Sequence, residues 1–297
     1  MTALSGTAAG GTPRRSRAAT SGWRWTSENP PPVSYTHLIG YTYDEFYERF
    51  GEYFGTTITK SFYDEPTLKQ FREAGTEGNR TWTPNFNAMF EERYPGENPM
   101  LYYPALFYDI GANTQEARDK LYTARSDMFA TSFIKQMNDW CADRGIQYMG
   151  HLYSEETVNP VSISGDLMRT FKYQSIPGVD HIGNANNTHQ ISRVITSAAY
   201  NWDKPLVMSE TYGAAGANMP VGDLYRWAMD EFAAGVNYIV PHAVWYNDKV
   251  NVFYPPELSY RNEKYAAELQ PYNTYVARLN QMLQGGRHVA DIGVRCV

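Results

Sequence analysis

Residues 145–156 read GIQYMGHLYSEE, and this stretch carries the pattern on which the fold prediction depends. Gly145 ends a long amphipathic run, and residues 146–152 form a short apolar segment that is followed, after Tyr153 and Ser154, by two glutamates. A short apolar strand between a helix and a polar loop is typical of parallel sheets whose faces are covered by helices. The stretch therefore predicts an α/β fold with this strand in its interior.

The same alternation continues on both sides of this stretch. Apolar or β-branched runs predict strands at residues 56–63, 146–152, 179–182, 206–209, 237–240 and 288–294. Helical spacing predicts helices at residues 43–54, 115–144, 188–202, 221–234 and 263–283. We therefore predict an incomplete TIM-like (β/α)₈ barrel with about six strands, in which the first two strands, expected before Ile39, are missing.

Residues 1–38 differ in composition from the rest of the chain. They are rich in Gly, Ala, Ser, Thr, Pro and Arg and lack periodicity, which predicts a disordered leader. No apolar segment follows the arginines, so no signal peptide is visible. The segment VSYTHL at residues 33–38 is what the end of a transposon used in DNA library preparation would encode, so one hypothesis is that the leader is a sequencing or assembly artefact. The partial catalytic barrel is assigned to residues 39–297.

Composition narrows the function classes. The net charge is −6 and no basic stripe lies outside the leader, which argues against a nucleic-acid partner. No run of 18 apolar residues is present, so no membrane span is predicted. The two cysteines form no disulfide framework or zinc pattern. The 24 Tyr and 7 Trp either fill a large core or offer the flat faces and polar tips that bind sugars.

Catalytic groups of such barrels lie just beyond the C-terminal ends of the strands. Acidic, histidine and aromatic side chains follow the predicted strands at those positions, and any one of them alone is more often a solvated loop residue. In chain order they are Asp64, Glu65, His151, Tyr153, Glu155, Glu156, His181, Asn184, Glu210, Tyr212, His242 and Trp245.

Carboxyl groups on different strand ends suit glycosidic hydrolysis. One carboxylic acid protonates the leaving oxygen, and a second carboxylate activates water or attacks carbon. We expect Glu155 and Glu210 to be this pair, with Glu65 and Glu156 as further catalytic candidates or ligands of a hard cation. The other positions are candidates for substrate binding: Asp64, His151, Tyr153, His181, Asn184, Tyr212, His242 and Trp245.

Four motifs resemble glycoside hydrolases related to the α-L-rhamnosidases of family 106. Residues 145–156 are similar to the family's "GI.Y.GHL..EE" strand, and residues 204–214 (KPLVMSETYGA) to its "K…SE.YGA.G" strand. Residues 165–169 (GDLMR) with 176–182 (IPGVDHI) resemble its "GD.MR…IPGID" segment, and residues 63–66 (YDEP) its "DEP" strand end. The likeness extends over residues 39–297.

The resemblance implies a secreted or periplasmic enzyme that degrades polysaccharides, with an inverting mechanism assisted by calcium. It supports catalytic candidacy for Glu155, as general acid, and Glu210, as general base. Family members are longer and carry β-sandwich domains, so activity of this chain by itself is in doubt. No cofactor is required by the sequence itself, and the oligomeric state is not indicated.

Two alternatives stay open at this point. One is a retaining barrel glycosidase with Glu210 as the nucleophile, which the spacing of the carboxyl groups would distinguish from an inverting enzyme. The other is a barrel that binds carbohydrate without catalysis, which would keep its binding when Glu155 and Glu210 are replaced by Gln.

Overall fold

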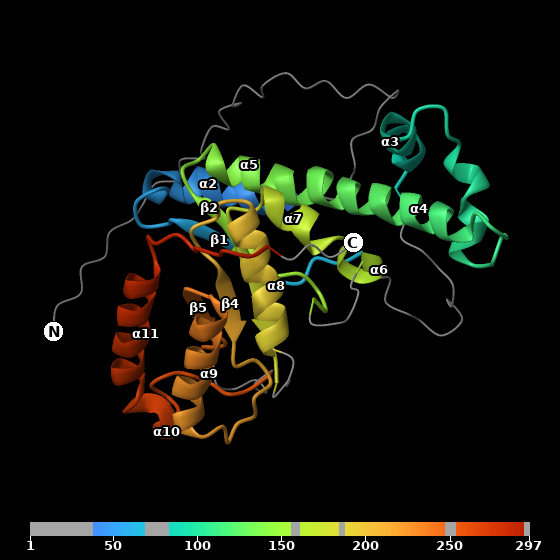
Figure 1. The fold of residues 1–297 in the computed structure, drawn as a ribbon. Helices are drawn as coiled ribbons and strands as arrows, with labels where there is room; N and C mark the ends of the chain where they lie inside the picture. Colours follow the sequence, from blue (N-terminus) through green and yellow to red (C-terminus); the bar gives the residue numbers. More distant parts are fainter. Residues whose placement is uncertain (1–37, 69–82, 156–160, 184–187, 247–253, 294–297) are drawn as a thin grey trace, which may run out of the picture.

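The computed structural model describes residues 38–68, 83–155, 161–183, 188–246 and 254–293. Within these ranges the protein has an α/β fold around one parallel sheet of five strands in sequential order (Figure 1). The strands are β1 (Lys60–Tyr63), β2 (Gln147–Gly150), β3 (Ile176–His181), β4 (Met208–Thr211) and β5 (Tyr238–Pro241).

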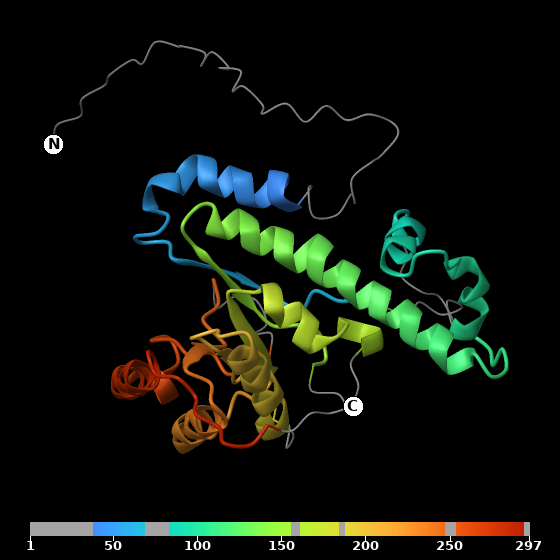
Figure 2. The same cartoon turned by 45° about the horizontal axis from the view of Figure 1, so that its top comes forward.

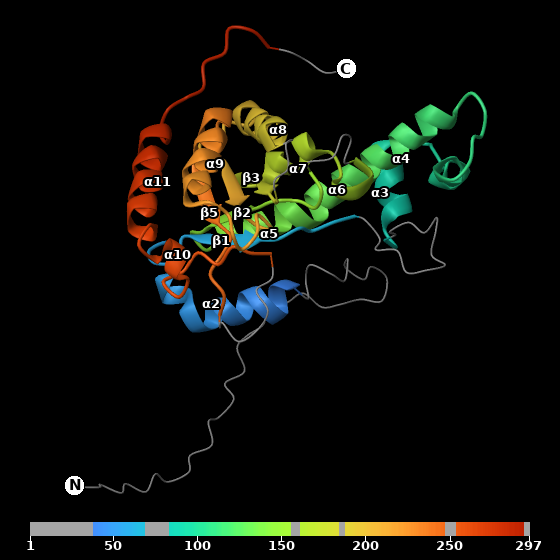
Figure 3. The same cartoon turned by 90° about the horizontal axis from the view of Figure 1, so that it is seen from below.

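Helices connect the strands and cover one face of the sheet. Figure 3 shows α7, α8 and α9 side by side along that face. The helices are α2 (Asp44–Phe50), α3 (Phe86–Arg93), α4 (Thr114–Phe129), α5 (Gln136–Ala142), α6 (Val161–Ser164), α7 (Leu167–Tyr173), α8 (Thr188–Asn201), α9 (Val221–Ala234), α10 (Glu263–Ala266) and α11 (Leu269–Leu283).

The predicted helix over residues 115–144 forms a nearly continuous rod. A π-helical segment, Ala130–Lys135, joins α4 to α5, and Gly145 follows in the left-handed conformation that glycine favours. Trp140 packs edge-to-face against Tyr43 and Tyr47, so α2 lies beside the α5 end of the rod (Figure 2). The far end of α4 carries α3 on a small separate core (Phe86, Phe90, Leu121, Ala124 and Met128).

The sheet curls so strongly that its two outer strands approach each other. The ammonium of Lys60 in β1 lies 5.0 Å from the ring centre of Tyr238 in β5, although three strands separate them in the sheet order. We call the concave side of the sheet its inner face. A small cluster of Met149, Ile176 and Met208 fills the inner face, while the main core lies between the sheet and the helices, on the helix face.

Glycine is required where the inner face is most crowded. A Cβ atom on Gly178 would lie 2.5 Å from the carbonyl oxygen of Gly150 and 2.6 Å from Cγ of Met208. No side chain fits into that space, so the glycine allows Met208 to cross the inner face directly above β3.

The prediction of a sixth strand at residues 288–294 is wrong for the described part of that segment. Residues 288–293 form no strand, and Val289 and Ile292 are more than 80% exposed. A strand needs a neighbour to satisfy its backbone groups, and the segment does not reach the free edge of β5.

Two helix predictions also change. The predicted helix over residues 263–283 is divided into α10 and α11, because the ring of Pro271 would clash with the carbonyl of Ala267 in a continuous helix. The predicted helix over residues 43–54 forms, but its aromatic stripe is not buried: Phe46 and Phe50 are 56% and 40% exposed. The remaining predicted strands and helices are present with boundaries shifted by a few residues.

Parallel strands and covering helices confirm the α/β class, and the curl of the sheet is consistent with an incomplete barrel. The described strands number five. The predicted leader lies outside the described residues up to position 37. No helix in the described ranges is both long and apolar enough to cross a lipid bilayer.

Candidate active site

At the C-terminal edge of the sheet, each strand, or the residue directly after it, contributes one polar side chain to the inner face. Side chains alternate between the two faces of a strand, and residues paired across parallel strands point the same way. Asp180 pairs with Glu210 in register, and Gly178 pairs with Met208 one layer below. Asp64, His151 and His242 follow directly after β1, β2 and β5. We call these five residues the acidic layer: Asp64, His151, Asp180, Glu210 and His242.

His151 is the centre of the acidic layer. Its Nε2 lies 2.7 Å from Oε2 of Glu210, a hydrogen-bond distance, and 3.6 Å from Oδ1 of Asp64. Its Nδ1 lies 3.8 Å from Oε1 of Glu155. Burial alone would lower the pKa of His151. The hydrogen bond that His151 donates to Glu210 and the negative charge of Glu155 outweigh burial and raise that pKa to about 10.

Glu155 lies beneath this layer and is almost inaccessible to water, with 1% of its surface exposed. Its Oε1 accepts a hydrogen bond from the backbone N–H of Asp180 at 2.9 Å, and its Oε2 has no hydrogen-bond partner among the described residues. Burial raises the pKa of Glu155 to about 8, although the positive charge of His151 acts in the opposite direction. Burial therefore favours the protonated form of Glu155.

Asp180 joins the layer although the sequence interpretation did not select it. Burial, and then the negative charges of Glu210 and Glu65, raise its pKa to about 7 against the effect of His151. The signal was present in the sequence: Asp180 stands two residues after Gly178 on a strand whose alternate residues face inward. The interpretation considered residues beyond the strand end and thus selected its neighbour, His181.

The other predicted acids lie at or beyond the edge of the layer. Asp64 is the most open member, with 71% of its side chain exposed. Glu65 has a positive φ of 43° and is close enough to raise the pKa of Asp180. Glu156 and Asn184 fall outside the described residues.

Two predicted sugar-binding residues belong to the helix face and do not join the acidic layer. His181 stacks on Trp227 of α9, and the hydroxyl of Tyr212 donates to the carbonyl of Leu224 in α9 at 2.7 Å. Both are buried. Each follows an inward-facing acid by one or two residues, and in each case the chain turns the side chain towards the helices.

Three predicted substrate-binding residues remain near the layer or its rim. His242 Nε2 lies 4.0 Å from Oε1 of Glu210, and Trp245 packs edge-to-face on the ring of His242 with centroids 5.8 Å apart. Both are half-buried. Tyr153 is also half-buried, and its backbone carbonyl accepts a hydrogen bond from the hydroxyl of Ser164.

The layer also offers a candidate cation site. Asp64, His151 and Glu210 each present one ligand atom, and these atoms lie within 4.8 Å of one another. The carboxylate oxygens suit a hard cation such as Ca²⁺, and an added positive charge would compensate the crowded acids around Asp180. The imidazole nitrogen is a poorer ligand for Ca²⁺, which prefers oxygen.

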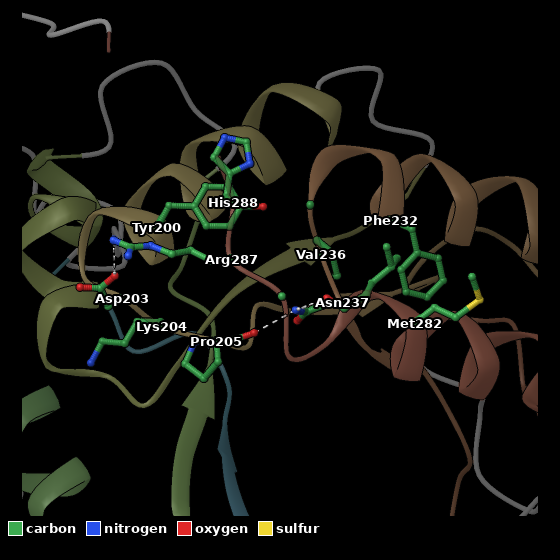
Figure 4. Close-up of a pocket in the computed structure, with 13 residues that line it drawn as sticks. Tyr200, Asp203, Lys204, Pro205, Phe232, Val236, Asn237, Met282, Arg287 and His288 are labelled. Atoms are coloured by element: carbon green, nitrogen blue, oxygen red, sulfur yellow. Dashed lines mark hydrogen bonds and ion pairs between the residues drawn. The ribbon is translucent and has the colours of Figure 1, made fainter. Parts of the chain in front are cut away.

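A separate cavity of about 530 Å³ lies at the opposite, N-terminal end of β4 and β5 (Figure 4). It is formed by the turns before these strands, the end of α11 and the segment that follows, with Tyr200 stacked on His288 at 4.2 Å. None of the predicted site residues lines it. The cavity and the acidic layer are therefore at opposite ends of the same strands.

Comparison with known proteins gives a family match and matches to solved structures. A family model described as alpha-L-rhamnosidase, glycoside hydrolase family 106, matches residues 43–294. The solved structure of a rhamnosidase from Novosphingobium sp. PP1Y is similar to this chain with a TM-score of 0.59 and 23% sequence identity. That similarity covers 71% of this chain and 21% of the other, so this chain spans about a fifth of the length of that protein. No curated protein matches the chain significantly.

Proposed function

This chain belongs to the α-L-rhamnosidases of glycoside hydrolase family 106, and from that premise we propose that it carries the catalytic centre of an enzyme that hydrolyses α-L-rhamnosyl linkages in oligo- or polysaccharides. One observation carries the proposal: Glu155 and Glu210 contact opposite nitrogens of the same imidazole, that of His151. One ring therefore lies between the two carboxyl groups, and the proposed inverting mechanism requires their separation to be roughly 6.5–9.5 Å.

In the proposed reaction Glu155 is the general acid. Burial favours its protonated form, which has the proton that the leaving glycosidic oxygen needs. Glu210 is the general base. It accepts a proton from water while the water oxygen bonds to the anomeric carbon and the glycosidic C–O bond breaks. The products are a free sugar of inverted configuration and an alcohol.

The protonated His151 has a positioning part in this scheme. As a cation between the two carboxyl groups it holds the carboxyl group of Glu210, the proposed general base, in a fixed position through a hydrogen bond. The backbone N–H of Asp180 holds Oε1 of Glu155 in place. A bound Ca²⁺, which the family implies, would be held by Asp64 and Glu210 and would supply positive charge for binding sugar hydroxyls.

We further propose that the sheet is part of a (β/α)₈ barrel, that residues 39–297 form a partial catalytic domain, and that the protein acts outside the cytoplasm, in the periplasm or the medium. The strand order, the curl and the position of the acidic layer at the C-terminal edge support the barrel. The family supports the location.

Hydrolysis of aryl glycosides tests the function. The protein should release the aryl group from an aryl α-L-rhamnoside, and an aryl β-D-glucoside of the same leaving group is the control. Proton NMR of the first product formed should show inversion. Release of the retained anomer would instead favour Glu210 as nucleophile, and absence of release for every sugar would contradict the proposal.

Carbohydrate binding without turnover is a second candidate, favoured by the closure of Glu155 from solvent. An acid that a substrate cannot reach does not protonate it. Under this alternative an L-rhamnoside would bind to the protein, would not be cleaved, and would bind equally well to the Glu155→Gln variant.

A further inference from the structure

A buried carboxylate lies directly behind the acidic layer, on the helix face of the sheet. Glu231 of α9 is 1% exposed, and both of its oxygens have polar neighbours. Its Oε1 lies 2.7 Å from Nδ1 of His181, out of line with the ring N–H, and its Oε2 accepts a hydrogen bond from the hydroxyl of Ser192 at 2.9 Å. The group thus links α9 to β3 and α8.

The link reaches the proposed active site through Asp180, the residue that precedes His181 in β3. Asp180 and His181 are consecutive on β3 and face opposite sides of the sheet. The backbone N–H of Asp180 donates to Glu155, and Asp180 pairs in register with Glu210. A shift of the His181 side chain would therefore displace the backbone group that holds the proposed general acid.

Trp227, on the same helix, completes the restraint. The ring of Trp227 stacks on His181 with centroids 4.5 Å apart and planes within 11°. The ring centroid of Tyr212, which follows β4, lies 6.0 Å from that of Trp227. His181 is consequently held by a flat apolar surface on its face and by a carboxylate at its edge. These two contacts leave its ring little freedom to rotate.

A requirement of stability alone does not explain this arrangement. Removing a carboxylate from water is costly, and well-packed apolar groups of similar volume often stabilise such a position equally well or better. Leu224 and Phe232 are also buried on α9. The carboxylate adds a hydrogen bond with Ser192 and a close polar contact with His181.

We propose that Glu231 is a positioning residue: through His181 it fixes the end of β3, so that the Asp180 N–H stays bonded to Glu155 and the Asp180 carboxyl stays beside Glu210. The catalytic consequence rests on the function proposed above. The geometric claim does not, because Glu231 contacts neither acid directly.

Backbone amide exchange tests the geometric claim without any substrate. In the Glu231→Ala variant, measured by NMR on the full chain, the Asp180 amide should exchange at least about tenfold faster relative to the amides of β2. The matched control is Asp223→Asn, which removes a carboxylate from the same helix that bonds only to Arg226 in the described residues. Its exchange pattern should equal that of the unmodified protein.

Glu231→Gln keeps the side-chain volume and the capacity to bond Ser192, and serves if the alanine variant does not fold. It should also increase exchange at Asp180 selectively, by a smaller factor. Equal increases across all strands, or no change at Asp180 in a folded variant, would show that Glu231 only stabilises the fold and would overturn the inference.

Kinetics then connect the geometry with catalysis. If the unmodified protein hydrolyses rhamnosides, Glu231→Gln should lower kcat and leave KM nearly unchanged, because Glu231 does not touch substrate. A protein that hydrolyses none would contradict the proposed function and leave the exchange result valid.

Discussion

The two faces of the sheet differ sharply at the same edge. On the inner face Asp64, Asp180 and Glu210 crowd around one histidine, and the pKa values of Glu155 and Asp180 are raised to about 8 and about 7. On the helix face polar side chains pair with one another and with the helices: Ser209 bonds Thr211, and Tyr212 bonds both α9 and Tyr272.

The difference shows how one short strand can serve two purposes. Residues that alternate along β3 and β4 supply reactive groups on one face and packing on the other. Strongly raised pKa values of carboxyl groups are common at functional sites. We therefore expect changes to the acidic layer to affect turnover, and changes to packing residues of the helix face such as Tyr212 to affect stability.

Replacing the inner acids should have the largest effect. Glu155→Gln and Glu210→Gln should each lower kcat for an aryl α-L-rhamnoside by roughly 10²–10⁴-fold, since each removes a proton-transfer group and keeps its volume. Tyr212→Phe on the helix face is the control and should lower the melting temperature more than kcat. Equal losses of activity in all three variants would remove the contrast between the faces.

Crowding on the inner face predicts a large loss of stability. Gly178→Ala places a methyl group within 2.6 Å of two neighbours and should lower the free energy of unfolding by about 1–3 kcal/mol or more. In Gly213→Ala the added carbon meets its nearest neighbour at 3.6 Å, an ordinary contact, and the variant should be nearly neutral. Urea unfolding of both variants measures the difference, and similar values would contradict the packing described here.

The acidic layer also predicts the direction of the pH dependence. Glu155, Asp180 and His151 all have raised pKa values in the folded protein, about 8, 7 and 10. The folded state therefore binds more protons than the unfolded state, and stability should be greatest below about pH 4 for these groups and fall as pH rises towards about 10.

Urea midpoints between pH 5 and 9, with a chelator present, measure this slope. In the Glu155→Gln variant, the urea midpoint should depend less on pH below pH 8 than in the unmodified protein. Stability that increases over this range in the unmodified protein would be the opposite of the expected sign.

The smallest expected effect is the increase in the free energy of unfolding that a bound cation produces. Calcium at ten times its dissociation constant would add about 1.4 kcal/mol to the free energy of unfolding. Asp64→Asn should remove most of this increment, because it replaces the open carboxylate of the candidate site. An unchanged melting temperature with calcium, or the same increase in the variant, would exclude these residues as ligands.

Much of the fold could be predicted from sequence because burial follows simple periods. The strands that end near Gly150, His181 and Thr211 and the helix at residues 221–234 all show clear patterns. The segment at residues 288–293 shows the same apolar pattern and forms no strand, since pairing depends on a neighbour that local sequence does not specify. The break at Ala267 could have been predicted from Pro271.

The sequence predicted which strand ends contribute to the candidate site, but not which face of the sheet each side chain occupies. Glu155, Glu210, His151 and Asp64 meet around one ring, as their positions at strand ends suggested. His181 and Tyr212 turn away, and Asp180 replaces them, because the start of the inward alternation depends on the sheet register. Glu231 carried no signal, since its role arises only from the packing of α9 on β3.

The most direct test of the account is a crystal structure of the protein with an L-rhamnose-based transition-state analogue. The account predicts the ring of the analogue against the acidic layer, with its anomeric centre between the carboxyl groups of Glu155 and Glu210. An analogue bound instead in the cavity beside Tyr200 and His288, at the far end of the strands, would contradict it.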